Sequence, residues 1–110
     1  MIMDVAGDEP VARTLERVHG SGRTPYLVRG TTKGELLASF ADALGFPEYF
    51  GMNLDALVDS LRDVEIQTPA TIVWDDAETF ADADRRTYET VRQILSRHLP
   101  DEVDVLLCLR

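Results

Sequence analysis

The sequence predicts an α/β domain built on a small parallel sheet, and three observations lead to this fold class. Short apolar stretches typical of strands occur at 26–29, 70–74 and 103–109. Segments with the apolar spacing of amphipathic helices lie between them. At 110 residues, 45% of them hydrophobic, the chain is the size of one domain that can bury a core without metals or disulfides. We therefore expect a single domain, 1–110, with three parallel strands, right-handed crossovers and about four flanking helices. These patterns leave the order of the strands open.

The N-terminal part of the chain has the weakest signals. Val11, Leu15 and Val18 are spaced for one or two turns of an amphipathic helix, which Gly20-Ser21-Gly22 would end. The first predicted strand, Tyr26 to Arg29, follows. We interpret residues 1–25 as an N-terminal extension of the domain.

A helix is predicted after the first strand. Thr32-Lys33-Gly34-Glu35 has the pattern of a capping box, and Gly45 and Pro47 end the helix. Its apolar residues share one face: Leu36, Leu37, Phe40, Ala41 and Leu44.

A second helix, about 54–63, is predicted to start at Asn53, which is a good N-cap residue. Its apolar residues recur at i, i+3, i+4 and i+7: Leu54, Leu57, Val58 and Leu61.

The C-terminal part of the chain predicts strand, helix and strand. The β-branched and aromatic run Ala70 to Trp74 fits a buried strand, and Asp75-Asp76 stops it and suggests a helix cap. Tyr88, Val91, Leu95 and Leu99 mark the apolar face of a helix of about 84–98. The nearly continuous apolar run from Val103 to Leu109 is typical of a strand covered on both faces, which makes Cys108 a core thiol. Trp74 is interpreted as a core residue.

The protein is strongly acidic, with a net charge of −9. The excess is concentrated from Asp42 to Asp84, where 11 acidic residues face a single basic one, Arg62. Because phosphate backbones require clustered Lys and Arg, direct binding of nucleic acid is disfavoured. The simplest explanation of the charge is solubility, and a basic partner protein is the alternative.

Location and cofactors are constrained by what the sequence lacks. No apolar stretch reaches the roughly 18 residues of a membrane span, and the first residues do not resemble a signal peptide. The single cysteine, Cys108, cannot form an internal disulfide. We expect a soluble cytoplasmic protein, monomeric when free, without cofactor, metal ligands or membrane contact. His19 and His98 have no partners at metal-ligand spacing, so they are assigned no role.

One helical face carries charge. On the helix 54–63, Asp55, Asp59 and Arg62 share a face away from the apolar residues. Asp55 lies in the first turn, where the helix dipole favours a negative charge. Asp59 lies mid-helix at i+4 from Asp55, where two like charges repel. A solvated face, with Arg62 relieving the repulsion, is the common explanation of such a pattern, and binding of a cationic partner is the other.

The segment Pro47-Glu48-Tyr49-Phe50-Gly51-Met52-Asn53-Leu54-Asp55-Ala56-Leu57-Val58-Asp59 resembles the barstar family of intracellular ribonuclease inhibitors. The order of elements from about Tyr26 onward is also similar to that family, which makes 26–110 a barstar-like core. In this family the aromatic pair, the glycine and the acidic helix close a ribonuclease active site. The resemblance implies an inhibitor, not an enzyme.

The resemblance also implies roles for individual residues. Asp59 would be the main anchor in a phosphate pocket, and Asp55 a second anion. Tyr49 would contact a catalytic His, while Asn53 and Leu54 would position the loop. The expected partner is a small basic extracellular ribonuclease, guanyl-specific and microbial, bound 1:1.

The chain departs from the family archetype on the same helix. Val58 stands where the archetype has Trp, and Arg62-Asp63-Val64 where it has Thr-Gly-Trp. Arg62 would bring a cation toward a basic target unless it folds back on Asp59. We therefore expect Val58 and Arg62 at the contact surface, with a target and affinity that differ from those of the archetype. Met52 replaces a more polar loop residue there.

Two alternatives remain. The first is an immunity or regulatory protein of the same fold that binds a different basic nuclease toxin or another basic enzyme. The second is an enzyme that uses Asp55 and Asp59 as acid and base or as Mg²⁺ ligands. The sequence lacks a phosphate-binding glycine loop and an activated nucleophile, which disfavours the enzyme. We assign no catalytic residue.

Overall fold

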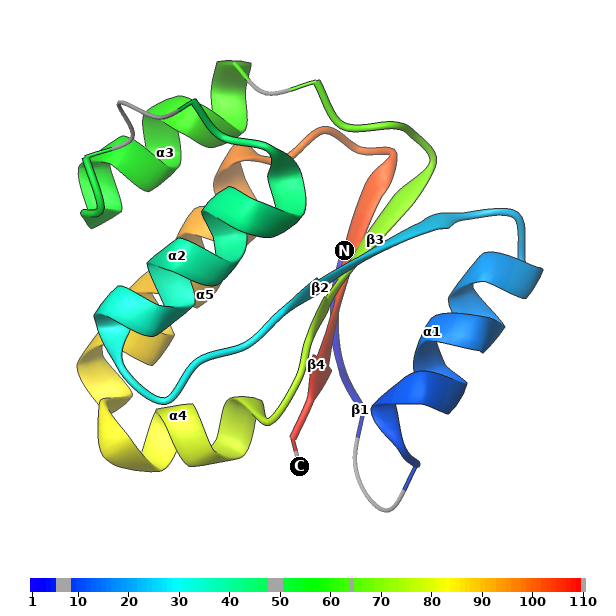
Figure 1. Ribbon diagram of the computed structural model, residues 1–110, viewed down its shortest axis with the longest axis horizontal. Helices are drawn as coiled ribbons and strands as arrows, with labels where there is room; N and C mark the ends of the chain where they lie inside the picture. Colours follow the sequence, from blue (N-terminus) through cyan, green and yellow to red (C-terminus); the bar gives the residue numbers. More distant parts are fainter. Residues whose placement is uncertain (6–8, 48–50, 64, 110) are drawn as a thin grey trace.

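The computed structural model describes residues 1–5, 9–47, 51–63 and 65–109. They form a parallel sheet with helices on both faces (Figure 1). The strands are β1 (Ile2–Val5), β2 (Thr24–Val28), β3 (Ala70–Trp74) and β4 (Val103–Cys108), in the order β1-β4-β3-β2. The predicted α/β class and parallel sheet are confirmed. The predicted strand number of three is wrong, because the described residues form four.

The strand missed in the sequence is β1. It pairs in parallel with β4, in a register from Ile2↔Val105 to Val5↔Cys108. Only Ile2 and Val5 of its four residues are half-buried, and Met3 and Asp4 are exposed. Such a short edge strand lacks the run of β-branched residues that identifies a strand, and its partner lies about a hundred residues away. The first residues of the chain thus extend the sheet at the β4 edge.

The helices are α1 (Val11–Gly20), α2 (Lys33–Leu44), α3 (Leu54–Asp63), α4 (Ala77–Ala83) and α5 (Arg85–His98). The described residues thus contain five helices, one more than expected. The additional helix is the seven-residue α4, which precedes the helix predicted near 84–98. Asp84 divides the two helices, since its carboxylate accepts the backbone N–H of Thr87 at 3.1 Å and caps α5. None of the helices in the described residues is long and apolar enough to span a membrane.

The strand order explains which face each helix covers. The connections β2 to β3 and β3 to β4 move across the sheet in one direction, and β1 to β2 moves in the other. Crossovers of the same hand must then place α1 on the face opposite α2 and α5. Figure 1 shows this arrangement, with α1 alone on one side of the sheet. The N-terminal residues therefore cover a face that the other helices leave open.

Alternating strand residues point into two apolar layers. Ile72, Trp74 and Leu107 pack with α2, α3, α4 and α5, whereas Val73, Leu106 and Cys108 pack with Val18 of α1 and its neighbours. Trp74 is fully buried, and Cys108 is 5% exposed, so both are core residues as predicted. Burial also raises the pKa of the Cys108 thiol.

The predicted N-cap of α2 is confirmed, but the capping box differs from its usual form in the residue that Glu35 binds. The hydroxyl of Thr32 accepts the Glu35 N–H at 3.1 Å. The Glu35 carboxylate accepts the backbone N–H of Thr31 at 2.9 Å, not that of Thr32, and these bonds to Thr31 lower the pKa of Glu35. Gly30 packs against this turn so closely that a Cβ atom there would lie 2.5 Å from the Leu36 nitrogen, which requires glycine.

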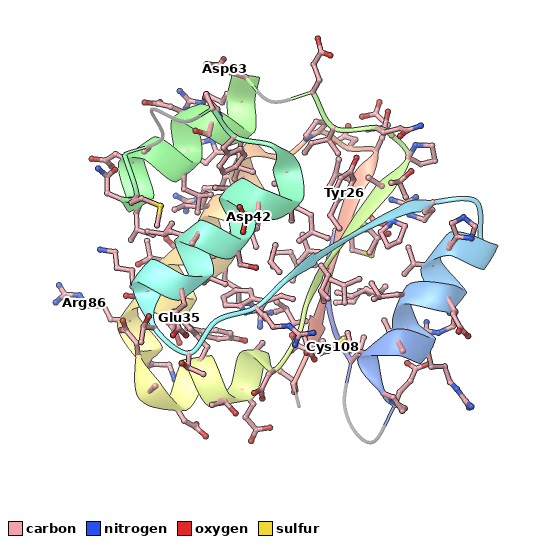
Figure 2. The ribbon with its side chains drawn as sticks, in the orientation of Figure 1. Tyr26, Glu35, Asp42, Asp63, Arg86 and Cys108 are labelled. Atoms are coloured by element: carbon pink, nitrogen blue, oxygen red, sulfur yellow. The ribbon has the colours of Figure 1, made fainter. Side chains whose placement is uncertain are left out.

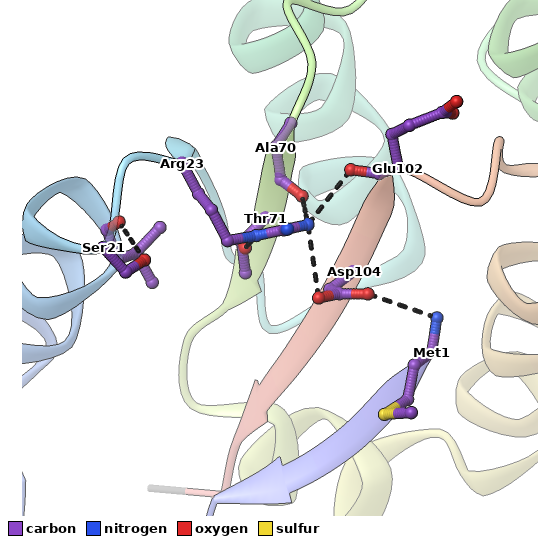
Figure 3. A network of polar contacts seen from close by, with 8 residues as sticks. Met1, Ser21, Arg23, Ala70, Thr71, Glu102 and Asp104 are labelled. Atoms are coloured by element: carbon purple, nitrogen blue, oxygen red, sulfur yellow. Dashed lines mark hydrogen bonds and ion pairs between the residues drawn. The ribbon is translucent and has the colours of Figure 1, made fainter.

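Arg23 ties three strands together at one end of the sheet (Figure 3). Its guanidinium donates hydrogen bonds to the Thr71 hydroxyl at 2.9 Å and to the carbonyl oxygen of Ala70 at 2.6 Å. It also reaches the carbonyl oxygen of Glu102 at 3.0 Å and the Asp104 carboxylate at 3.2 Å. The other oxygen of that carboxylate lies 3.5 Å from the amino group of Met1 at the start of β1. One side chain thus links residues that are far apart in the sequence.

We expect Arg23→Ala to destabilise the fold by about 2 kcal/mol, because a charged donor to several partly buried acceptors is lost. Arg23→Lys should recover only part of that stability, since an ammonium group cannot reproduce the planar fork. Urea denaturation of the three proteins measures both effects. Equal midpoints for Arg23→Ala and the wild type would contradict the assigned role.

Candidate functional site

The helix α3 lies on the side of the sheet opposite α1 and contacts α5 (Figure 1). Its predicted span and apolar face are confirmed. Leu57 and Leu61 are buried in the core, and Leu54 and Val58 are half-buried against it. The helix is therefore anchored along one side, and its opposite side is open to solvent.

Asn53 fixes the start of this helix. Its side-chain oxygen accepts the Ala56 N–H at 2.7 Å, which satisfies one of the free donors of the first turn. Its side-chain nitrogen donates to the carbonyl oxygen of Gly51 at 3.4 Å, and its backbone carbonyl accepts the Leu57 N–H at 3.0 Å. The predicted N-cap is confirmed, and the end of the preceding loop is held to the helix by one side chain.

Asp55 and Asp59 are both exposed on the open side of α3. Within the described part of the chain, neither carboxylate makes an ion pair or a side-chain hydrogen bond. Arg62 is also exposed and makes no ion pair among the described residues. The structure therefore does not show Arg62 folded back on Asp59, which was one explanation for a cation at this position. Two carboxylates and one guanidinium are left available on one helical surface.

Other acidic residues of the middle segment have structural roles, in contrast to Asp59. Asp75 forms an ion pair with Arg29 at 3.3 Å, and Asp76 accepts the Thr79 hydroxyl at 2.7 Å. Asp84 caps α5, and its hydrogen bonds with Thr87 lower its pKa. The fold thus accounts for these charges, and on α3 it accounts for Asp55 through the helix dipole but not for Asp59.

Two further exposed carboxylates lie on α2 and α3. Asp42 on α2 and Asp63 at the C-terminal end of α3 are both exposed (Figure 2). The exposed surface of α3 thus carries three carboxylates, Asp55, Asp59 and Asp63, against one cation, Arg62.

The remaining predicted site residues are placed as follows. Leu54 and Val58 lie at the margin between the core and the open side of α3, each half-buried. Tyr49 lies outside the described residues, so its predicted contact has no structural description. Met52, which was not among the predicted site residues, is 44% exposed and has a positive φ of 54°. The sequence signal for it was the replacement of a more polar loop residue of the family archetype.

The shape of this region does not suggest a small-molecule site. A groove of about 690 Å³ lies between β1, α4 and α5 and is lined by Arg85, Tyr88 and Arg92, among others, without any residue of α3. Among the described residues, no group of three His, Cys, Asp or Glu side chains could hold a metal ion. The surface of α3 is suited to contact with another macromolecule.

The fold and this surface define a small parallel α/β domain with one well-anchored helix, whose exposed carboxylates Asp55 and Asp59 have no partner among the described residues. The chain belongs to the barstar family, whose model, described as Barstar (barnase inhibitor), matches residues 26–104. The family resemblance seen in the sequence is confirmed. The matched range includes α3 with its acidic residues, whereas β1 and α1 precede it. A comparison with curated proteins found no match.

Proposed function

We propose that this protein is a stoichiometric inhibitor of a small, basic, extracellular ribonuclease of the guanyl-specific microbial kind. The family is one of ribonuclease inhibitors, and its matched range contains α3. The observation that carries the proposal is the pair of exposed carboxylates, Asp55 and Asp59, that have no partner among the described residues. The inhibitor would bind 1:1 and cover the active site.

Electrostatics explain how this surface could block such an enzyme. A ribonuclease cleft holds phosphate with cationic side chains, and charge-assisted hydrogen bonds to carboxylates are similarly strong. Asp55 and Asp59 lie four residues apart, about 6 Å along the helix axis, close to the spacing of successive phosphates in a nucleic-acid strand. Because neither has a partner among the described residues, binding would break no ion pair between them. The carboxylates would occupy phosphate sites and exclude RNA.

The anchored helix supports this mechanism. Binding is weakened when flexible groups must be ordered, so a preformed surface improves affinity. The Asn53 cap and the buried Leu57 and Leu61 hold α3 in place before any partner arrives. In the proposed complex, Asp59 is the main anchor and Asp55 the second anion. Tyr49 contacts the catalytic site, Asn53 and Leu54 set the loop, and Val58 and Arg62 lie at the contact surface.

The negative charge should also speed association with a basic enzyme. We expect the association rate constant to fall roughly tenfold or more between about 0.01 and 0.5 M salt, while dissociation changes less. Stopped-flow mixing at several salt concentrations measures this dependence. A rate constant independent of salt would contradict electrostatic steering by the acidic surface.

A different basic nuclease toxin is the second candidate target, and Arg62 favours it. The Arg62 guanidinium has no ion-pair partner among the described residues, so it calls for an acceptor on the partner protein, which a uniformly cationic phosphate cleft does not offer. In that case the chain would be an immunity or regulatory protein using the same surface. For either target we propose a cytoplasmic location, where the inhibitor would protect the producing cell.

The test is a titration of the purified protein into small guanyl-specific ribonucleases from several bacteria, together with unrelated basic nucleases. Stoichiometric loss of RNA cleavage in the first group supports the proposed function. Inhibition confined to the second group would favour the immunity protein. A rise in melting temperature with Mg²⁺ that depends on Asp55 and Asp59 would instead support the enzyme alternative.

A further inference from the structure

The loop before α3 contains a backbone conformation that its residue type disfavours. Met52 has a φ of 54°, in the left-handed region, where a side chain with a Cβ is crowded and glycine is not. In the described part of the chain, the other non-glycine residue with positive φ is Asp76. Aspartate tolerates this region, and the Asp76 carboxylate accepts the Thr79 hydroxyl at the start of α4. Met52 has neither explanation.

The Met52 side chain contributes little to the stability of the fold that would offset this strain. Met52 is 44% exposed and is not among the residues packed against either apolar layer. The bonds that cap α3 come from Asn53, so the cap does not require a methionine beside it. Glycine at this position would have neither the steric strain nor the exposed apolar surface. Since strained residues tend to occur at functional sites, the side chain itself is the candidate reason.

The position of Met52 indicates what the side chain contacts. It directly precedes Asn53 and lies three residues before Asp55, one of the two α3 carboxylates that have no partner in the described part of the chain. Other large hydrophobic residues exposed in the described chain, Met1 and Met3, lie in or beside the edge strand β1. Met52 is therefore an apolar group at the border of a charged contact surface. A flexible thioether adapts to an irregular apolar surface on a partner.

We propose that Met52 is a specificity-determining contact, which packs on an apolar or aromatic patch of the ribonuclease beside its phosphate-binding cations. This inference rests on the proposed function and names a second recognition element in it. The carboxylates would select a basic cleft, and Met52 would select among basic clefts by the surface next to them. Its packing would also exclude water from the neighbouring ion pairs, which strengthens them.

The test exploits opposite effects on stability and binding. In Met52→Gly we expect the melting temperature to stay the same or to rise by about 2–5 °C, because the steric strain is removed. The same variant is titrated into a ribonuclease that the wild-type protein inhibits. We expect its Kd to be about 10-fold to 100-fold higher than that of the wild type, since an apolar contact is lost. Calorimetry gives the melting temperature, and inhibition titration gives Kd.

Three further variants separate contact from conformation. Asparagine tolerates the left-handed region, so Met52→Asn should keep the melting temperature and weaken binding. Met52→Leu keeps an apolar side chain and should stay within about threefold of the wild-type Kd. Met3→Thr removes an equally exposed methionine from β1 and should leave Kd unchanged.

The outcomes distinguish this inference from the proposed function. Unchanged affinity in Met52→Gly and Met52→Asn, with affinity lost in Asp59→Ala, would overturn the role of Met52 and leave the inhibitor intact. A clear fall in the melting temperature of Met52→Gly would show that the side chain serves the fold, which also overturns the inference. If the wild type inhibits no ribonuclease of the panel, both proposals fail.

Discussion

Replacing Asp59 with alanine is expected to weaken ribonuclease binding by at least about 3 kcal/mol, more than a hundredfold in Kd. The carboxylate is exposed mid-helix and has no partner among the described residues, so its loss costs the fold little. In the complex it would be enclosed with cationic groups that remain buried and unpaired after truncation. Close charge pairs between the family's archetype and its ribonuclease couple by about 1.5–7 kcal/mol, and we adopt the lower part of that range.

The matched control for this variant is Asp82→Ala. Asp82 is exposed on α4, and its replacement changes the net charge by the same amount. We expect its Kd to stay within about threefold of the wild-type value, because general steering is a minor part of affinity. If Asp59→Ala inhibits as well as the wild type, or if both variants lose affinity equally, Asp59 is not the anchor.

Replacing Trp74 with alanine is expected to have the largest effect on stability, a loss of about 3–5 kcal/mol. Trp74 is fully buried in β3 and packs against the rings of Phe80 and Tyr88 at centroid distances of 5.7 and 5.5 Å. Its truncation would open a cavity between the sheet and the helices α4 and α5. Since small domains have only about 5–15 kcal/mol of stability in total, the variant should be marginally folded.

Trp74→Phe should lose much less stability, about 1–2 kcal/mol. The Trp74 Nε1 is buried without a hydrogen-bond partner in the described chain, and phenylalanine removes that unpaired donor. The stability gained by removing the unpaired donor partly offsets the stability lost with the smaller ring. Far-UV circular dichroism in urea is the appropriate measurement, because Trp74 is the single tryptophan and its fluorescence disappears in both variants. A loss below about 1 kcal/mol in Trp74→Ala would contradict the packing described.

Strong local patterns in the sequence predicted most of the fold. Residues Ala70 to Trp74 form β3 with the bounds expected from their β-branched run, and α3 begins at the residue after the predicted Asn53 cap. The strand β1 and the helix α4 were missed. Both are short, and their stability comes from packing on distant parts of the chain, which a local pattern does not contain. The order of the strands could not be predicted for the same reason, because it depends on pairing between distant parts of the chain.

The residues of the candidate site could be predicted from the sequence, but their side-chain contacts and backbone conformations could not. Helical spacing placed Asp55, Asp59 and Arg62 on one face, and the structure finds all three exposed on α3. Whether Arg62 pairs with Asp59 depends on side-chain conformation, which spacing does not determine. The left-handed backbone of Met52 was not predictable either, because methionine carries no signal for it.

The separation of α1 from α3 by the sheet has a practical consequence for attaching probes. Cys108 is the one cysteine and is buried, so a cysteine introduced on the solvent side of α1, such as Ala12→Cys, would be the readily accessible thiol. A fluorophore or a surface tether attached there would lie across the sheet from α3 (Figure 1), the helix that carries Asp55 and Asp59. Labelled protein could therefore report on partner capture at α3 while the label stays clear of the contact surface.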